Sequence, residues 1–122
     1  MGWIMFERGS NYLVKLYPSK GAEPGKTRPV LVLQTNLLYS IDHSMIIILP
    51  LTTNLIDEAY PLRLRISKSN NLLKDSEILF DQIRAVDRER LLPDKLASLS
   101  YNEMMEVELQ IQMLLDFTGS SL

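Results

Sequence analysis

Residues 29–33, "PVLVL", are an uninterrupted apolar run that directly follows the polar segment "KGAEPGKTR" at residues 20–28. A short apolar run bounded by turn residues is typical of a buried strand. The glycines and Pro24 of the polar segment predict a loop. A loop that only reversed the chain would not need charged side chains beside the strand. Arg28, at the mouth of this strand, is therefore the first candidate functional residue.

Further apolar segments of strand length recur along the chain between turn residues. In the segment "PLRLRI", leucine and isoleucine alternate with Arg63 and Arg65, which is the two-residue period of a half-buried strand. Five short strands predict a mainly β fold, a small twisted sheet that curls into a barrel. The expected strands are Tyr12–Leu16, Val30–Gln34, Met45–Leu51, Pro61–Ile66 and Glu77–Ala85.

The C-terminal segment predicts a long helix over about residues 101–116, packed on the barrel. Ser100 and Glu103 have the spacing of a capping box, and no Gly or Pro follows until Gly119. An apolar stripe recurs at helical spacing and is widened by three further residues. The stripe is Met104, Val107, Ile111 and Leu114, and the widening residues are Met105, Leu109 and Leu115. We expect one domain over residues 1–122.

The composition excludes several classes of site and of protein. The chain has no cysteine, which excludes disulfides and thiolate zinc sites, and its one histidine, His43, excludes multi-histidine metal sites. No metal site and no cofactor are expected. The start contains Glu7, unlike a signal peptide, and the longest apolar run, Met45–Leu51, is far short of the ~20 residues that span a bilayer. We therefore expect a cytoplasmic protein that does not enter a membrane.

The charge distribution separates the chain into two halves. Residues 1–70 hold eight Lys or Arg against five Asp or Glu, a net charge of +3, whereas residues 71–122 hold five against ten, a net charge of −5. A basic half can attract phosphate. A random scatter of surface charge explains these numbers equally well.

Arg28 and Thr52 are the residues whose chemistry suits a phosphate. An arginine anchored on a buried strand can bind a phosphate with two donors and stabilise charge that develops on it. Thr52 ends an apolar strand, and its hydroxyl can donate to a phosphoryl oxygen. Arg28 can equally pair with a surface carboxylate, and Thr52 can cap a turn. Spacing alone does not decide between these roles.

Five blocks of the chain, in order from about Arg8 to Leu115, resemble the MazF/PemK toxins, the mRNA interferases of bacterial toxin–antitoxin pairs. The blocks are "YLVKLYPSKGAEPGKTRPVLVLQ", "IIILPLTTN", "PLRLRI", "DSEILFDQIRAVDRERL" and "LSYNEMMEVELQIQMLL". The resemblance implies an SH3-like barrel of the CcdB/MazF type with a C-terminal helix, working as a homodimer. It also implies metal-independent cleavage of single-stranded RNA to 2′,3′-cyclic phosphate and 5′-hydroxyl ends, and a cognate MazE-like antitoxin as partner.

The resemblance also assigns roles to residues. The catalytic arginine of the family matches Arg28 and its catalytic threonine matches Thr52, while its loop glutamate matches Glu23, a candidate helper that takes the 2′ proton or bonds to a base edge. The glutamine of the D-Q-I-R block matches Gln82, which can read a base edge or bond to backbone. The expected RNA-binding residues are Lys20, Lys26, Thr27, Thr53, Gln82 and Arg84.

The chain departs from the family pattern at Ser10, Lys15, Tyr17, Thr35 and Asn36. Up to four of these positions are acids in the family, and we expect most of them near the RNA groove, so the usual cleavage specificity is in question. Two alternatives to an enzyme share the fold: a CcdB-like toxin that binds gyrase, and a non-catalytic RNA-binding barrel. CcdB toxins use a tryptophan near the C-terminus, whereas the only tryptophan here is Trp3.

Overall fold

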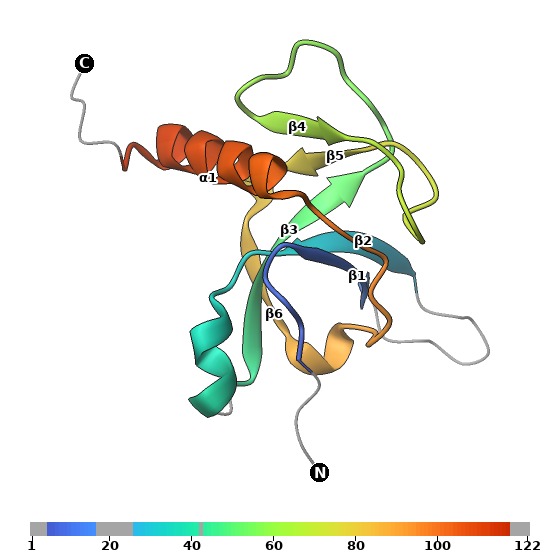
Figure 1. The fold of residues 1–122 in the computed structure, drawn as a ribbon, viewed down its shortest axis with the longest axis vertical. Coiled ribbons are helices and arrows are strands. Elements are labelled where there is room, and N and C mark those ends of the chain that lie inside the picture. The colour runs from blue at the N-terminus through green and yellow to red at the C-terminus, as the bar shows by residue number, and fades with distance from the viewer. Residues whose placement is uncertain (1–4, 17–25, 42, 118–122) are drawn as a thin grey trace.

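The computed structural model describes residues 5–16, 26–41 and 43–117, which form one antiparallel sheet and the helix α1 (Tyr101–Leu115) (Figure 1). The sheet has the strand order β4-β5-β3-β2-β1-β7, and β6 pairs with β3 outside this path. The mainly β fold with a C-terminal helix is confirmed. The strands are β1 (Ser10–Lys15), β2 (Thr27–Val32), β3 (Met45–Thr52), β4 (Arg63–Ile66), β5 (Ser76–Leu79), β6 (Arg84–Asp87) and β7 (Ala97–Ser98).

The sheet has seven strands where the sequence predicted five. The short β7 adds to β1, and the segment expected as one strand, Glu77–Ala85, is broken by a 3₁₀ turn at Phe80–Gln82. Leu51 faces Ile78, so a straight strand would place residue 81 opposite Ile48. Arg84 stands there instead. The 3₁₀ turn accommodates this shift in register. It allows β5 to pair with the end of β3 and β6 to pair with the start of β3.

The two faces of the sheet carry separate hydrophobic clusters, as the alternation of side chains along strands requires. On one face Val14, Val30 and Ile48 pack with residues from the N-terminal segment and from β6. On the other face Leu31, Leu49 and Ile78 pack with Phe80 of the 3₁₀ turn and with α1. Burial on both faces explains the continuous apolar runs in β2 and in the second half of β3, whereas Met45 and Ile47 in the first half of β3 are exposed.

The helix α1 begins with the capping box that the sequence predicts. The Ser100 Oγ accepts a hydrogen bond from the Glu103 amide (3.1 Å), and the Glu103 Oε1 accepts one from the Ser100 amide (2.8 Å). Val107 is fully buried, and the rest of the predicted stripe packs beside it. No helix in the described residues is long and apolar enough to cross a membrane.

A second apolar stripe on α1 is exposed, although Met113 within it accepts a hydrogen bond from the Tyr60 hydroxyl (3.3 Å). The three residues expected to widen the packed stripe are exposed, each by more than two fifths. Residues four apart lie on one helical face, and an exposed apolar residue recurs at that spacing. This outer stripe is Tyr101, Met105, Leu109 and Met113, with Phe117 just beyond the helix. The barrel alone does not account for it.

Candidate active site

Arg28 and Thr52 lie on neighbouring strands, each two residues beyond the last pair of the ladder that joins them. That last pair is Val30 and Pro50. Beyond it Arg28 pairs with Val14 of β1, and Thr52 pairs with Glu77 of β5. Because side chains alternate along a strand, Arg28 projects to the face of Val30 and Thr52 to the face of Pro50, which is the same face of the sheet. Both residues that sequence analysis selected for phosphate chemistry therefore lie on one face, at the end where the pairing of β2 with β3 stops.

A pocket of about 80 Å³ opens on this face of the sheet. Its lining comes from β1, β2, β3 and β6 and from the turns beside β6, and includes four cationic residues, Lys15, Arg28, Arg84 and Arg90. No Asp or Glu is among the described residues that line it. A concave surface that is lined by positively charged side chains concentrates anions. The remaining lining residues are Val14, Leu16, Val30, Ile48, Pro50, Gln82 and Val86.

The pocket gathers some of the predicted RNA-binding residues and not others. Gln82 and Arg84 line it with exposed side chains, as does Arg28. Lys26, Thr27 and Thr53 are exposed at the ends of β2 and β3 but are not among the residues that line it. Lys20 and Glu23 lie outside the described residues.

Arg90 was missed by sequence analysis, and Lys15 was noted only as a departure. Arg90 belongs to a 3₁₀ turn, Arg88–Arg90, and its Nη1 donates to the Leu16 carbonyl (3.5 Å). A bridge between Val14 and Leu91 holds this turn beside β1. Such a contact between distant segments leaves no periodic signal in the sequence, so only the tertiary structure could reveal it.

The Thr52 hydroxyl has the capping role that sequence analysis left open. Its Oγ1 accepts a hydrogen bond from the Asn54 amide (3.1 Å), in the turn that follows β3. A hydroxyl that accepts one hydrogen bond still has its own proton to donate. The capping role and a bond to a phosphoryl oxygen are therefore compatible, and the cap orients the hydroxyl.

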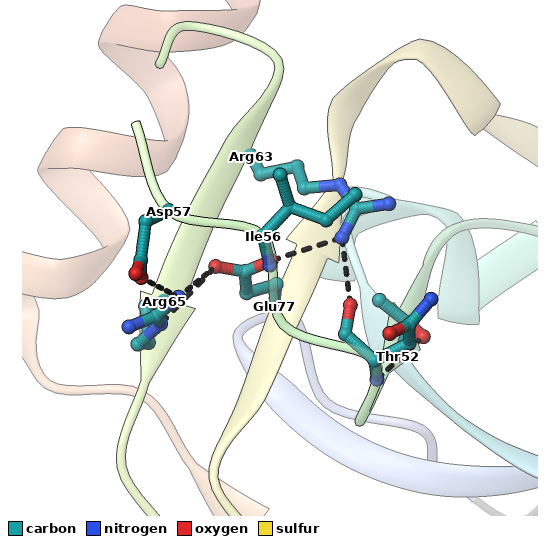
Figure 2. A network of polar contacts seen from close by, with 7 residues as sticks. Thr52, Ile56, Asp57, Arg63, Arg65 and Glu77 are labelled. Atoms are coloured by element: carbon teal, nitrogen blue, oxygen red, sulfur yellow. Dashed lines mark hydrogen bonds and ion pairs between the residues drawn. The ribbon is translucent and has the colours of Figure 1, made fainter. Parts of the chain in front are cut away.

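A buried carboxylate stands next to Thr52 on the same face. Glu77 is the cross-strand partner of Thr52 in the β3–β5 ladder and of Arg65 in the β4–β5 ladder. Figure 2 shows the contacts around it. Glu77 Oε1 accepts from the Ile56 amide and from Arg63 Nη1, both at 2.9 Å. Its Oε2 accepts from Arg65 Nε (3.1 Å) and Nη2 (2.9 Å).

The network continues from Glu77 to the loop between β3 and β4. Arg63 Nη1 also donates to the Asn54 carbonyl (2.9 Å), and Arg65 Nη2 also donates to Asp57 Oδ1 (2.8 Å). Burial acts to raise the pKa of the Glu77 carboxyl, but the hydrogen bonds from Ile56, Arg63 and Arg65 outweigh burial and hold this pKa below its ordinary value. Hydrogen bonds to Asp57 and Glu77 raise the pKa of Arg65. Glu77 is therefore ionised at neutral pH.

Several departures from the family pattern have structural partners outside the pocket. The Ser10 Oγ is hydrogen-bonded to the Ser98 Oγ (2.9 Å), where β1 meets β7. The Thr35 Oγ1 accepts from the Leu37 amide (3.2 Å), and the Asn36 Oδ1 accepts from the Arg8 amide (3.0 Å). Lys15 lines the pocket, and Tyr17 lies outside the described residues. Of the departures among the described residues, Lys15 alone lines the pocket, and the expectation that most of them lie near the RNA groove stays a prediction.

Comparison with known proteins gives a consistent result for sequence and fold. Residues 7–115 match the model of the family described as PemK-like, MazF-like toxin of type II toxin–antitoxin system. The chain is 38% identical over 107 residues to the endoribonuclease MazF of Staphylococcus epidermidis, covering 85% of this chain and 86% of that protein.

Solved structures of low sequence identity share the fold. MazF in a MazE–MazF complex from Deinococcus radiodurans superposes with a TM-score of 0.73 at 23% identity, covering 93% of this chain and 98% of that one. The Mycobacterium tuberculosis toxin MazF-mt6 gives 0.70 at 18% identity, covering 88% and 96%.

Proposed function

The chain belongs to the PemK-like, MazF-like toxins of type II toxin–antitoxin systems, and on this premise we propose that it is an endoribonuclease that cleaves single-stranded mRNA. The observation that carries the proposal is the position of Arg28. It lies at the start of a buried strand, lines a cationic pocket and is on the same face of the sheet as Thr52, which ends the neighbouring strand. The similar protein from Staphylococcus epidermidis is named an endoribonuclease.

The residues present suit attack by a ribose 2′-hydroxyl on the adjacent phosphorus. The 2′ oxygen forms a bond to phosphorus as the bond to the 5′ oxygen breaks, so the products are a 2′,3′-cyclic phosphate and a 5′-hydroxyl. Arg28 stabilises the additional charge on the phosphoryl oxygens and donates a proton toward the leaving 5′ oxygen. Thr52 donates to a non-bridging oxygen and orients the phosphate for in-line attack. Glu23 takes the 2′ proton, the role that its match to the family glutamate implies.

The rest of the pocket binds the strand around the scissile phosphate. Arg84, Arg90 and Lys15 supply positive charge for neighbouring phosphates. Gln82 presents a donor and an acceptor to one base edge, the kind of contact that readers of single-stranded RNA use. Exposed Lys26, Thr27 and Thr53, together with Lys20, extend this surface.

Two partners and a location follow from the same function. The outer stripe of α1 supports a homodimer, because a second copy would cover its exposed apolar side chains. MazE–MazF complexes are known for relatives, and a MazE-like antitoxin encoded with this chain would restrain its activity. Since the substrate is mRNA, we place the protein in the cytoplasm.

Digestion of a long mixed RNA, followed by sequencing of the new 5′ ends, tests the proposal. We expect one consensus at the cut sites and 5′-hydroxyl ends that accept a phosphate from polynucleotide kinase. If the RNA stays intact after incubation with folded protein of the native sequence, the proposed enzymatic function is wrong. Binding without cleavage would instead identify a non-catalytic RNA-binding barrel.

A further inference from the structure

We infer that Glu77 is a positioning residue for Thr52: the buried carboxylate fixes the turn that orients the Thr52 hydroxyl toward the scissile phosphate. This inference rests on the proposed ribonuclease function. Glu77 and Thr52 are cross-strand partners, so the carboxylate stands directly beside the residue that we assign to the phosphate.

Hydrogen bonds to the backbone of Asn54 on both sides link the two side chains (Figure 2). Arg63 Nη1 donates both to Glu77 Oε1 and to the Asn54 carbonyl, each at 2.9 Å. The Asn54 amide in turn donates to the Thr52 Oγ1. A second bond, from the Ile56 amide to Glu77 Oε1, holds the loop two residues further on. Glu77 therefore fixes the peptide groups on both sides of Leu55.

The bonding of Glu77 favours a positioning role over a direct catalytic one. Its two carboxylate oxygens accept four hydrogen bonds, which is about the full capacity of a carboxylate. Only 3% of its surface is exposed. A carboxylate in this state is a poor acceptor for a substrate proton, but it holds the donors around it in fixed directions.

Charge balance gives the inference a distinctive signature. Glu77 and Asp57 offset the charges of Arg63 and Arg65 on β4, the strand beyond Glu77 as counted from Thr52. Replacing Glu77 by glutamine leaves a positive charge uncompensated beside the phosphate site. The variant should therefore bind RNA as well as, or better than, the native protein while it turns RNA over more slowly. General destabilisation of the fold would not produce this split between KM and kcat.

The test compares Glu77→Gln with Thr52→Val, with the double variant, and with Asp57→Asn as the matched control. Asp57 belongs to the same network, but its contact with Arg65 is not part of the chain of bonds to Thr52. Hydrogen exchange of the backbone amides of Asn54 and Ile56 is measured on the free proteins. Steady-state kcat and KM are measured on one RNA oligonucleotide that contains the cleavage consensus.

In Glu77→Gln we expect the amides of Asn54 and Ile56 to exchange at least about tenfold faster, while the amides of the β2–β3 ladder keep their protection. We expect kcat to fall by about tenfold with no rise in KM, since small displacements of an orienting group cost up to ~10²-fold in rate. In the Thr52→Val background the same change should lower kcat by less than about twofold. The reason is that Glu77 acts through the Thr52 hydroxyl, which this variant lacks. Asp57→Asn removes an equal charge, so it should likewise not raise KM, but it should leave amide exchange and kcat near the native values.

Unchanged exchange at Asn54 and Ile56, or an equal loss of kcat in both backgrounds, would overturn the inference. If Thr52→Val cleaves at the native rate, the proposed role of Thr52 fails, and the exchange data still decide whether Glu77 fixes the turn. Should Glu77→Gln not fold, Arg63→Met and Arg63→Lys replace it. Arg63→Met breaks the link to Asn54 and should reproduce the loss in kcat, which Arg63→Lys should partly restore.

Discussion

Thr52 and Glu77 are cross-strand partners, and Arg65 extends the same row on the far side of Glu77. Arg28 lies on the other neighbour of β3, two residues beyond the last β2–β3 pair, where its partner is Val14 of β1. Strand backbone holds each member at a fixed distance from its neighbours. The chemistry of the site therefore depends on the register of the sheet, which is set by buried residues that never touch RNA.

Replacing Arg28 by alanine should abolish cleavage without unfolding the protein, because the side chain is exposed at a strand end. Loss of a donor that stabilises transition-state charge costs on the order of 10²–10³ in rate, and more if the same group donates the proton. Gel assays with chelator present measure the rate, and circular dichroism checks the fold. The exposed Lys74→Ala, which does not line the pocket, serves as the control. Full activity in Arg28→Ala would return Arg28 to the role of an ordinary surface charge.

RNA affinity should fall as salt rises, because pocket cations that contact phosphates release counterions. For single-stranded nucleic acid the slope of log K against log salt is about −0.7 per phosphate neutralised. Arg84→Gln and Arg90→Gln should each make the measured slope shallower by about this amount. Fluorescence anisotropy at several salt concentrations gives the slopes. An affinity independent of salt would argue against RNA as a ligand.

Acid should destabilise the protein through Glu77. The pKa of its carboxyl is lowered in the folded state, so at acid pH the unfolded chain binds more protons than the folded one. The resulting contribution to the free energy of unfolding is fully present above the ordinary value of 4.5 and is lost as pH falls through the lower folded value. Arg63 and Arg65 are 20% and 44% exposed, so the charges left behind are partly solvated, and Glu77→Gln should cost about 2 kcal/mol near neutral pH, in the range for hydrogen bonds to a charged group.

Urea unfolding of both proteins between about pH 7 and pH 3 measures this contribution. The difference between native protein and Glu77→Gln should shrink steadily below about pH 4.5. Titration of the other carboxylates affects both proteins alike and cancels in the difference. A difference that stayed constant down to pH 3 would show that the charge of Glu77 contributes nothing to stability.

A charge placed in the outer stripe of α1 should separate the proposed dimer. Leu109 is exposed by 45% in the single chain and lies at the centre of the stripe. Leu109→Glu would bury a carboxylate without a partner at the interface, so light scattering at micromolar concentration should give the monomer mass. Asn71→Glu adds the same charge in an exposed loop between β4 and β5 and should remain dimeric. A monomeric native protein under these conditions would contradict the dimer directly.

The sequence predicted the elements whose signals are local. The apolar run in "PVLVL" identified β2, and the Ser100–Glu103 spacing identified the start of α1, because burial and capping each leave a short, fixed pattern. The break at Phe80–Gln82 was not predictable. No Gly or Pro marks it, and it exists because β3 needs two partners in different registers.

The residues of the candidate site also fall into those that local sequence patterns predicted and those that only the tertiary structure reveals. Arg28, Gln82 and Arg84 were selected by their motifs, and the structure brings all three to one pocket. Arg90 reaches the pocket through a bridge between distant segments, and Glu77 acquires its importance from two arginines on another strand. Arg63 and Arg65 were assigned to one face of a strand from their alternation, but the sequence did not show what they bind.

The turn at Phe80–Gln82 also explains a proline in the middle of the sheet. The amide of Leu33 donates to the Ile47 carbonyl, so by alternation the backbone nitrogen of Pro50 points away from β2. On that side β3 pairs with β6 as far as Ile48 and with β5 from Leu51 onward. Pro50 therefore lies in the gap between the two partner strands. Proline has no backbone N–H, so at this position it loses no hydrogen bond of the ladder. Its ring restricts φ to about −65° two residues before Thr52. The interruption of one strand thus permits a stiffer backbone in its neighbour, two residues before Thr52, to which we assign the orientation of the phosphate.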